Sequence, residues 1–247
     1  MNQPFFQDDP SEKQPSALEY PSAGLAARVC LSGNWSLAAA VSAVLFALLL
    51  FSNSILAPFS RNGSTAASFM SFFVSVVLSL LLSLPVCGAC HVFLTLAKGG
   101  RPQLKDMIMP FSSQPDRFLL MALAEIICAL VAWSPLISLM FIPSVKQMPP
   151  ALLLILTAAG TVLVIFVRLN LSQTVFLLLE DNRLGALDAV RRSISMMRGR
   201  KMRLFKTLLP FFGCAALSVL SFGIGFLWTI PYYLTVRAAF YLIEFKN

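Results

Sequence analysis

A series of long apolar segments, separated by short charged blocks, limits the structures that this chain can adopt. A helix needs about 20 apolar residues to cross about 30 Å of hydrocarbon, because each residue adds about 1.5 Å. Four segments of this length stand alone, and residues 207–245 are long enough for two more. The sequence therefore predicts an all-α, polytopic helical membrane protein.

The composition supports this fold class. Of the 247 residues, 57% are hydrophobic and 12% are charged, and the mean hydropathy is +0.78. Soluble domains carry roughly 25% charged residues. The charged residues also gather between the apolar runs, as they do in membrane proteins. A water-soluble globular domain is excluded.

We predict six transmembrane helices, at residues 36–56, 67–97, 118–142, 151–179, 207–220 and 226–245. The turn at residues 221–225 separates the last two. Residues 23–247 would then form a single membrane domain, in which residues 23–34 begin with a short amphipathic helix. Residues 1–22 are polar and proline-rich, and they predict a disordered tail without the apolar run of a secretory signal.

The distribution of basic residues predicts the orientation. Lysine and arginine concentrate in residues 98–117 and 183–206, whereas the opposite loops contain only Arg61 and Lys146. Basic loops stay in the cytoplasm, so both termini are expected on the cytoplasmic side. This bias also explains the net charge of +8 without a nucleic-acid partner.

An amphipathic helix is expected between the fourth and fifth spans. Leu184, Leu187, Ile194 and Met197 recur at helical spacing, Asn182 suits the N-cap, and Gly199 marks the end. The helix would lie in the membrane interface. Its basic residues either bind anionic lipid headgroups specifically or only fix the orientation of the chain in the membrane. These residues are Arg191, Arg192, Arg198, Arg200, Lys201 and Arg203.

Residues 87–91 spell C-x-x-C-H, the attachment motif of c-type haem. Attachment needs an exported, accessible segment, and this one lies inside the second predicted span, so we expect neither haem nor another cofactor. Cys87, Cys90 and His91 share a helical face, and Cys128 lies at similar depth on the third span. Three thiols and one imidazole suit Zn or Cu(I), but packed, inert cysteines are the favoured interpretation, and no metal is predicted.

A polar layer is predicted about 10 to 18 Å from the cytoplasmic helix ends. Glu125 and Arg168 lie within the third and fourth spans, and Arg237 lies within the sixth. Charges at such depth are costly, so we expect Glu125 to pair with Arg168 or Arg237. The alternative is that each arginine reaches separately to the interface. Hydrogen bonds to the layer are expected from His91, Asn170, Tyr232 and Tyr233.

Several short motifs resemble a known bacterial membrane family, "domain of unknown function 975". They are Ala27-Arg28, Gly33-Asn34-Trp35, Leu96-Ala97-Lys98-Gly99, Asp181-Asn182, Ser193, Met197, Gly199, Leu204-Phe205, Gly223-Ile224-Gly225, Trp228, Pro231-Tyr232 and Phe240-Tyr241. The resemblance covers roughly residues 23–243. This sequence departs from the family pattern at two positions. Arg183 stands where the family commonly has proline, and Met202 stands where it commonly has an aromatic residue. The resemblance implies a six-span protein of the bacterial cytoplasmic membrane, with no assigned substrate.

Catalytic machinery is not apparent in the sequence. The chain contains one histidine and no nucleotide-binding G-x-x-x-x-G-K-[ST] loop, and the carboxylates outside the spans look like solvated charge partners. We therefore expect a protein that is not an enzyme. The first hypothesis is a cell-envelope component that acts through lipid or membrane-protein partners. The alternative is a transporter or channel for a small solute or ion, which would use the polar layer.

Overall fold

The structure is a computed structural model that describes residues 15–61, 65–112, 115–141, 150–181, 183–221 and 223–246. Every regular element in these ranges is a helix, which confirms the all-α class. Residues 1–14 of the predicted tail lie outside the described residues. Ala17–Glu19, in the remaining part of that tail, forms a short 3-10 helix (η1) that packs against α1 and α10.

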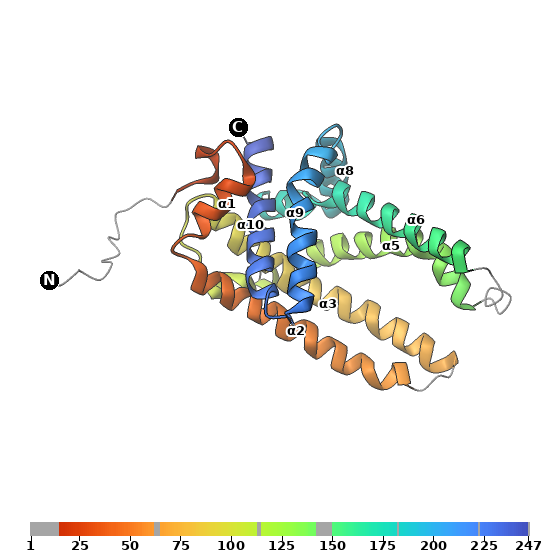
Figure 1. The fold of residues 1–247 in the computed structure, drawn as a ribbon. Coiled ribbons are helices and arrows are strands. Elements are labelled where there is room, and N and C mark those ends of the chain that lie inside the picture. The colour runs from red at the N-terminus through yellow and green to blue at the C-terminus, as the bar shows by residue number, and fades with distance from the viewer. Residues whose placement is uncertain are drawn as a thin grey trace.

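The helices follow the predicted segments closely (Figure 1). In chain order they are α1 (Ala23–Leu31), α2 (Trp35–Arg61), α3 (Thr65–Ala97), η2 (Leu104–Ile108), α4 (Met109–Ser112), α5 (Pro115–Phe141), α6 (Pro150–Leu171), α7 (Thr174–Glu180), α8 (Ala186–Met196), α9 (Lys201–Leu220) and α10 (Phe226–Phe245).

Four helical segments among the described residues are long and apolar enough to cross a membrane. They are Trp35–Pro58, Phe69–Ala97, Leu154–Glu180 and Lys201–Leu220. The third of these continues through a break at Ser172 and Gln173, between α6 and α7. The Ser172 hydroxyl donates to the carbonyl of Leu169 (2.8 Å) and accepts from the Gln173 amide (3.1 Å). These bonds satisfy part of the polar groups at a buried break in the helix, where the Gln173 side-chain oxygen and the Thr174 hydroxyl have no hydrogen-bond partner.

The buried core lies at one end of the helices. The α10 helix packs against α1, α2 and α3, and α7 packs against α3, α5 and α8. From this core the α2–α3 pair and the α5–α6 pair extend and diverge, as Figure 1 shows. Large apolar side chains remain exposed along these extensions, for example Phe73, Val131 and Leu154. Bilayer lipid would cover such surfaces.

The segment after α3 returns along that helix instead of leaving it. Gly88 of α3 lies against the backbone of Met107 in η2, where a Cβ atom would come within 1.9 Å of the Met107 carbonyl oxygen. Gly88 lies ten residues before Lys98, or about 15 Å along the helix. Part of the predicted 98–117 loop therefore packs beside the second predicted span, and a side chain at position 88 would prevent this contact.

The linker between α7 and α9 contains the predicted amphipathic helix. It begins at Ala186 with Gly185 as its N-cap, so the expected cap at residue 182, which lies outside the described residues, is wrong. Ala189 and Ser193 are buried, whereas Leu187 is 67% exposed. After the helix, Gly199 adopts a φ of 81°, which fits its predicted place at the helix end.

A buried arginine attaches this linker to α5. One terminal nitrogen of Arg117 donates to the carbonyl oxygens of Asp181 (3.3 Å) and Leu184 (3.1 Å). Ser193 adds a second tie, because its hydroxyl donates to the Asn170 carbonyl at the end of α6 (2.6 Å). The linker is thus held to both α5 and α6.

Candidate functional site

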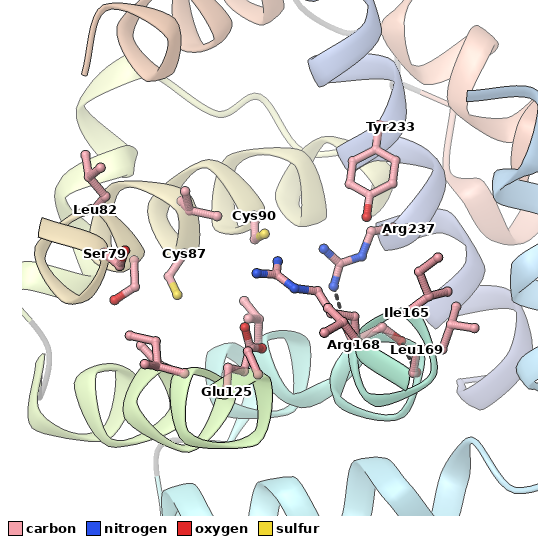
Figure 2. A pocket seen from close by; sticks show the side chains of 18 of the residues that line it. Ser79, Leu82, Cys87, Cys90, Glu125, Ile165, Arg168, Leu169, Tyr233 and Arg237 are labelled. Atoms are coloured by element: carbon pink, nitrogen blue, oxygen red, sulfur yellow. Dashed lines mark hydrogen bonds between the residues drawn. The ribbon is translucent and has the colours of Figure 1, made fainter. Parts of the chain in front are cut away.

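A cavity of about 990 Å³ lies where the helix pairs diverge. Side chains of α2, α3, α5, α6, α9 and α10 line it, and most of them are apolar. Its charged lining gathers at the end next to the core. Figure 2 shows Glu125 from α5, Arg168 from α6 and Arg237 from α10 pointing into this space, with Cys87 and Cys90 of α3 across from them.

Arg237 is held firmly in place. Its guanidinium donates to the backbone carbonyl of Ser172 at the α6–α7 break. The guanidinium carbon also lies 5.7 Å from the ring centre of Phe176 and 5.6 Å from that of Tyr233. The Nε atom, however, is buried without a hydrogen-bond partner. One donor of this arginine is therefore unsatisfied at the edge of the cavity.

Arg168 and Glu125 complete the charged end. Arg168 makes no hydrogen bond or ion pair with any residue that the structure describes, and its side chain is exposed to the cavity. Glu125 lies within electrostatic range of both arginines. Nevertheless, the ion pairs of the described chain do not include Glu125. The structure brings the three predicted charges into one cavity, and the pairing of Glu125 with an arginine stays a prediction.

Three other residues predicted for the polar layer do not line the cavity. The Tyr232 hydroxyl faces α1, where it donates to the Gly24 carbonyl and accepts from Arg28, each at 3.3 Å. Asn170 donates to the Phe166 carbonyl of its own helix (2.7 Å). The Nδ1 atom of His91 is buried without a hydrogen-bond partner, away from the cavity lining. The neighbouring Tyr233, in contrast, does line the cavity.

The cysteines are not gathered into a metal site. Cys87 and Cys90 are buried at the cavity wall, whereas Cys128 and His91 do not line it. Within the described ranges, no three histidine, cysteine or acidic residues are arranged to hold a metal ion. Cys30, in α1, is likewise a packed thiol. Burial, and secondarily the charge of Glu19, raises its pKa to about 11, which keeps it protonated and unreactive at neutral pH.

The six basic residues predicted to contact lipid fall into two groups. Three have partners within the chain: Arg200 and Arg203 pair with Glu244, and the Lys201 ammonium lies 4.2 Å from the ring centre of Phe166. The remaining three are exposed on and after α8, and they are Arg191, Arg192 and Arg198. Arg191 forms a loose, exposed ion pair with Asp188 (3.8 Å).

Two glutamates outside the predicted polar layer have structural roles that the sequence did not indicate. Glu180 forms ion pairs with Lys98 (2.6 Å) and Lys246 (3.0 Å) and accepts a hydrogen bond from the Tyr241 hydroxyl (2.7 Å), and its side chain is only 10% exposed. Glu244 is similarly enclosed, between Arg203 of α9 and Arg200 at the N-cap of that helix. The expectation of solvated charge partners outside the spans is wrong for Glu180, whereas Glu244 lies inside the sixth predicted span and was given no role. A signal was available, because each glutamate directly ends a long apolar run.

Comparison with known proteins places the chain in a family without assigning an activity. No curated protein and no solved structure matches the chain. Residues 25–244 match a family described as "Protein of unknown function (DUF975)". The match covers the core, the cavity and the α8 linker, and it agrees with the resemblance seen in the sequence motifs. The chain belongs to this DUF975 family.

Proposed function

We propose that the protein is a six-span component of the bacterial cytoplasmic membrane, that it is not an enzyme, and that it binds lipid in the cavity between its helices. The observation that carries this proposal is the cavity itself. It is largely apolar, it lies among the long apolar helices, and its volume of about 990 Å³ falls at the top of the usual range for ligand sites.

The proposed six crossings add α5 and α10 to the four apolar segments already described. Both are long: α5 runs from Pro115 to Phe141 and α10 from Phe226 to Phe245. They pack beside candidate spans, because α5 contacts α3 and α6 and α10 contacts α2, α3 and α9. Their deeper charges, Glu125 and Arg237, line the cavity, and Glu244 joins ion pairs near the end of α10, which reduces the cost of insertion. The α8 helix would lie at the interface, with Leu187 and Ile194 exposed to it.

The orientation can be tested by cysteine labelling. With the five native cysteines replaced, single cysteines at residues 101 and 198 are expected to resist an impermeant thiol reagent in intact cells. Single cysteines at residues 63 and 224 are expected to react. Permeabilised cells provide the control, because all four positions should then be labelled. Labelling of residue 101 or 198 from outside would contradict the cytoplasmic placement of both basic segments.

The dimensions of the cavity suit an acyl chain. Phe72 and Cys90 both line it and lie eighteen residues apart on α3, or about 27 Å. One leaflet of hydrocarbon is about 15 Å deep, half of the whole core. A chain of ordinary lipid length therefore fits along α3, with apolar side chains of α5 and α9 beside it. A small polar solute would leave most of the apolar side chains that line the cavity without a ligand contact.

Narrowing the cavity is expected to reduce the lipid that copurifies with the protein. Ser79 of α3 lines the cavity, as Figure 2 shows, so Ser79→Phe adds a ring inside it. Val77 does not line the cavity and is exposed, so Val77→Phe is the matched control. Lipid extraction and mass spectrometry after purification in detergent should find about one tightly held amphiphile per chain, lost in Ser79→Phe only. Equal retention in both variants would refute binding in the cavity.

Transport remains the second candidate, because Glu125, Arg168 and Arg237 provide charges inside the same space. Reconstituted vesicles separate the two functions. Lipid binding without solute or ion flux supports the proposed function. Flux that stops in Ser79→Phe, with no lipid retained by the unmodified protein, would instead support a translocation pathway.

A further inference from the structure

We infer that Arg168 and Arg237 form an anion site at the inner end of the cavity, which holds the acidic headgroup of an amphiphile while its chain lies along α3. The inference rests on the proposed lipid-binding function and specifies the ligand class: a lipid with a phosphate headgroup. It begins from the charges at this end of the cavity. Among the described residues that line the cavity, the charged side chains are Glu125, Arg168 and Arg237.

The charge balance leaves one cation without a partner. Two guanidinium groups face one carboxylate, and neither arginine forms an ion pair with it. Arg168 has no bonded partner among the described residues, and the Nε atom of Arg237 lacks an acceptor. An unpaired cation in a low-dielectric site is unfavourable. One additional negative charge between the guanidinium groups would neutralise this end of the cavity.

The chemistry of the two side chains favours an oxyanion. Arginine presents a planar set of N–H donors that matches phosphate or carboxylate oxygens in pairs. Arg237 is already fixed by Ser172, Phe176 and Tyr233, so little side-chain entropy is lost when its free donor binds. Figure 2 shows its guanidinium and that of Arg168 pointing into the same space. The site is therefore partly organised before a ligand arrives.

The two arginines lie at one end of the cavity, where they would contact a lipid headgroup and not its acyl chain. Arg237 and Tyr233 lie toward the core end of α10, and Cys90 occupies the same end of the lining on α3. Beyond them the lining carries no charged side chain, and it continues along α3 through serines and through apolar residues such as Val76 and Phe72. A ligand that satisfies both regions has an acidic group at one end and a hydrocarbon chain at the other. Free phosphate would satisfy only the arginines.

Three probes separate the contributions of head and chain. The full-length protein in detergent micelles is titrated with phosphatidic acid, with diacylglycerol that has the same two chains, and with inorganic phosphate. We expect phosphatidic acid to bind at least about tenfold more tightly than diacylglycerol, which corresponds to about 1.4 kcal/mol. Inorganic phosphate should bind far more weakly than phosphatidic acid, because it lacks the chain.

The arginine variant tests the site directly. Arg168→Gln should bring the affinity for phosphatidic acid down to that for diacylglycerol, and the affinity for diacylglycerol should not change. Arg183→Gln removes the same charge from an exposed position outside the cavity, so it should retain the tenfold preference. Thermal melting of both variants checks that they fold, and folding of Arg168→Gln is expected because this side chain has no bonded partner to lose.

The carboxylate variant gives an opposite expectation. Glu125 lies within electrostatic range of both arginines and repels an incoming anion, so Glu125→Gln should strengthen phosphatidic acid binding several-fold. Weaker binding in Glu125→Gln would contradict a repulsive role and would indicate that Glu125 positions the arginines. This result would still support the site, since Arg168→Gln reports on it independently.

The outcomes distinguish the two proposals. If the unmodified protein binds phosphatidic acid and diacylglycerol equally, lipid binding stands and the headgroup site is overturned. If it binds neither lipid, the proposed function fails and this inference fails with it. If inorganic phosphate binds as tightly as phosphatidic acid, the site takes a free anion, and the amphiphile is overturned. If Arg183→Gln abolishes the preference as Arg168→Gln does, the effect is a general surface charge and not this site.

Discussion

Gly88→Ala is expected to prevent stable folding. The new Cβ atom would lie 1.9 Å from the Met107 carbonyl oxygen and 2.7 Å from its carbon, and both are backbone atoms that no rotamer change can move. Relief requires η2 to separate from α3, which exposes the buried Met107 side chain. We expect a loss of at least about 3 kcal/mol, beyond the usual cost of overpacking. Thermal melting in detergent and the yield of monodisperse protein measure it.

Gly213→Ala is the matched control for this prediction. Gly213 lies within α9, and a Cβ atom there would meet nothing within 4 Å. Alanine is favoured over glycine in a helix by about 1 kcal/mol, so this variant should be unchanged or slightly more stable. If Gly88→Ala and Gly213→Ala melted alike, the close contact between α3 and η2 would be wrong.

Glu180→Gln is expected to have the second largest effect. Its carboxylate binds Lys98 directly after α3, Lys246 directly after α10 and the Tyr241 hydroxyl of α10, and it is almost fully enclosed. Glutamine keeps the size but removes the charge, so both lysines lose their partner. We expect a loss of about 3 kcal/mol, at the low end for a buried ion pair because the lysines are about half exposed. Denaturation in increasing dodecyl sulfate measures it.

Asp188→Asn provides the comparison for Glu180→Gln. It removes the same charge from an exposed pair with Arg191, in which the two side chains are 68% and 81% exposed. Such pairs contribute less than about 1 kcal/mol, so this variant should unfold close to the unmodified protein. An equal loss in both variants would show that net charge, and not the enclosed Glu180 cluster, controls stability.

The positions of the helices could be predicted from the sequence because hydrophobic length and turn residues mark them. The second predicted span ends at residue 97, as α3 does, because Gly99 adopts a φ of 79° just after it. The sixth span coincides with α10 at both ends. The fifth span was predicted to begin at residue 207, but α9 begins at Lys201. The basic residues there are predicted to belong to the interfacial segment, but lysine and arginine are good helix formers and they continue α9 toward its start.

The sequence predicts how deep the residues of the candidate site lie along their helices, but it does not predict which way their side chains point. Residue counts placed Glu125, Arg168 and Arg237 at similar depth, and all three line one cavity. The same counts could not separate Tyr232 from Tyr233, because neighbouring residues on a helix point about 100° apart. Tyr233 lines the cavity while Tyr232 faces α1. Helix rotation depends on the packing partners, and these come from elsewhere in the chain.

The packing of η2 back against α3 also could not be predicted from the sequence. It depends on one close backbone approach at Gly88, which looked like part of a haem-like motif. A single glycine inside an apolar run carries no sign of which segment will approach it. The same holds for the Glu180 cluster, whose partners are 82 and 66 residues away in the chain.

The packing of α10 against α1 has a consequence for the order of biosynthesis. Leu31 and Phe226 are separated by 195 residues, so α1 leaves the ribosome long before its partner exists. At about 5 to 20 residues per second, the delay is about 10 to 40 s. During that interval α1 can pack against α3 but not against α10, and Lys98 lacks its partner Glu180 until residue 180 is made. The core of the N-terminal half is therefore completed only after α10 has been translated.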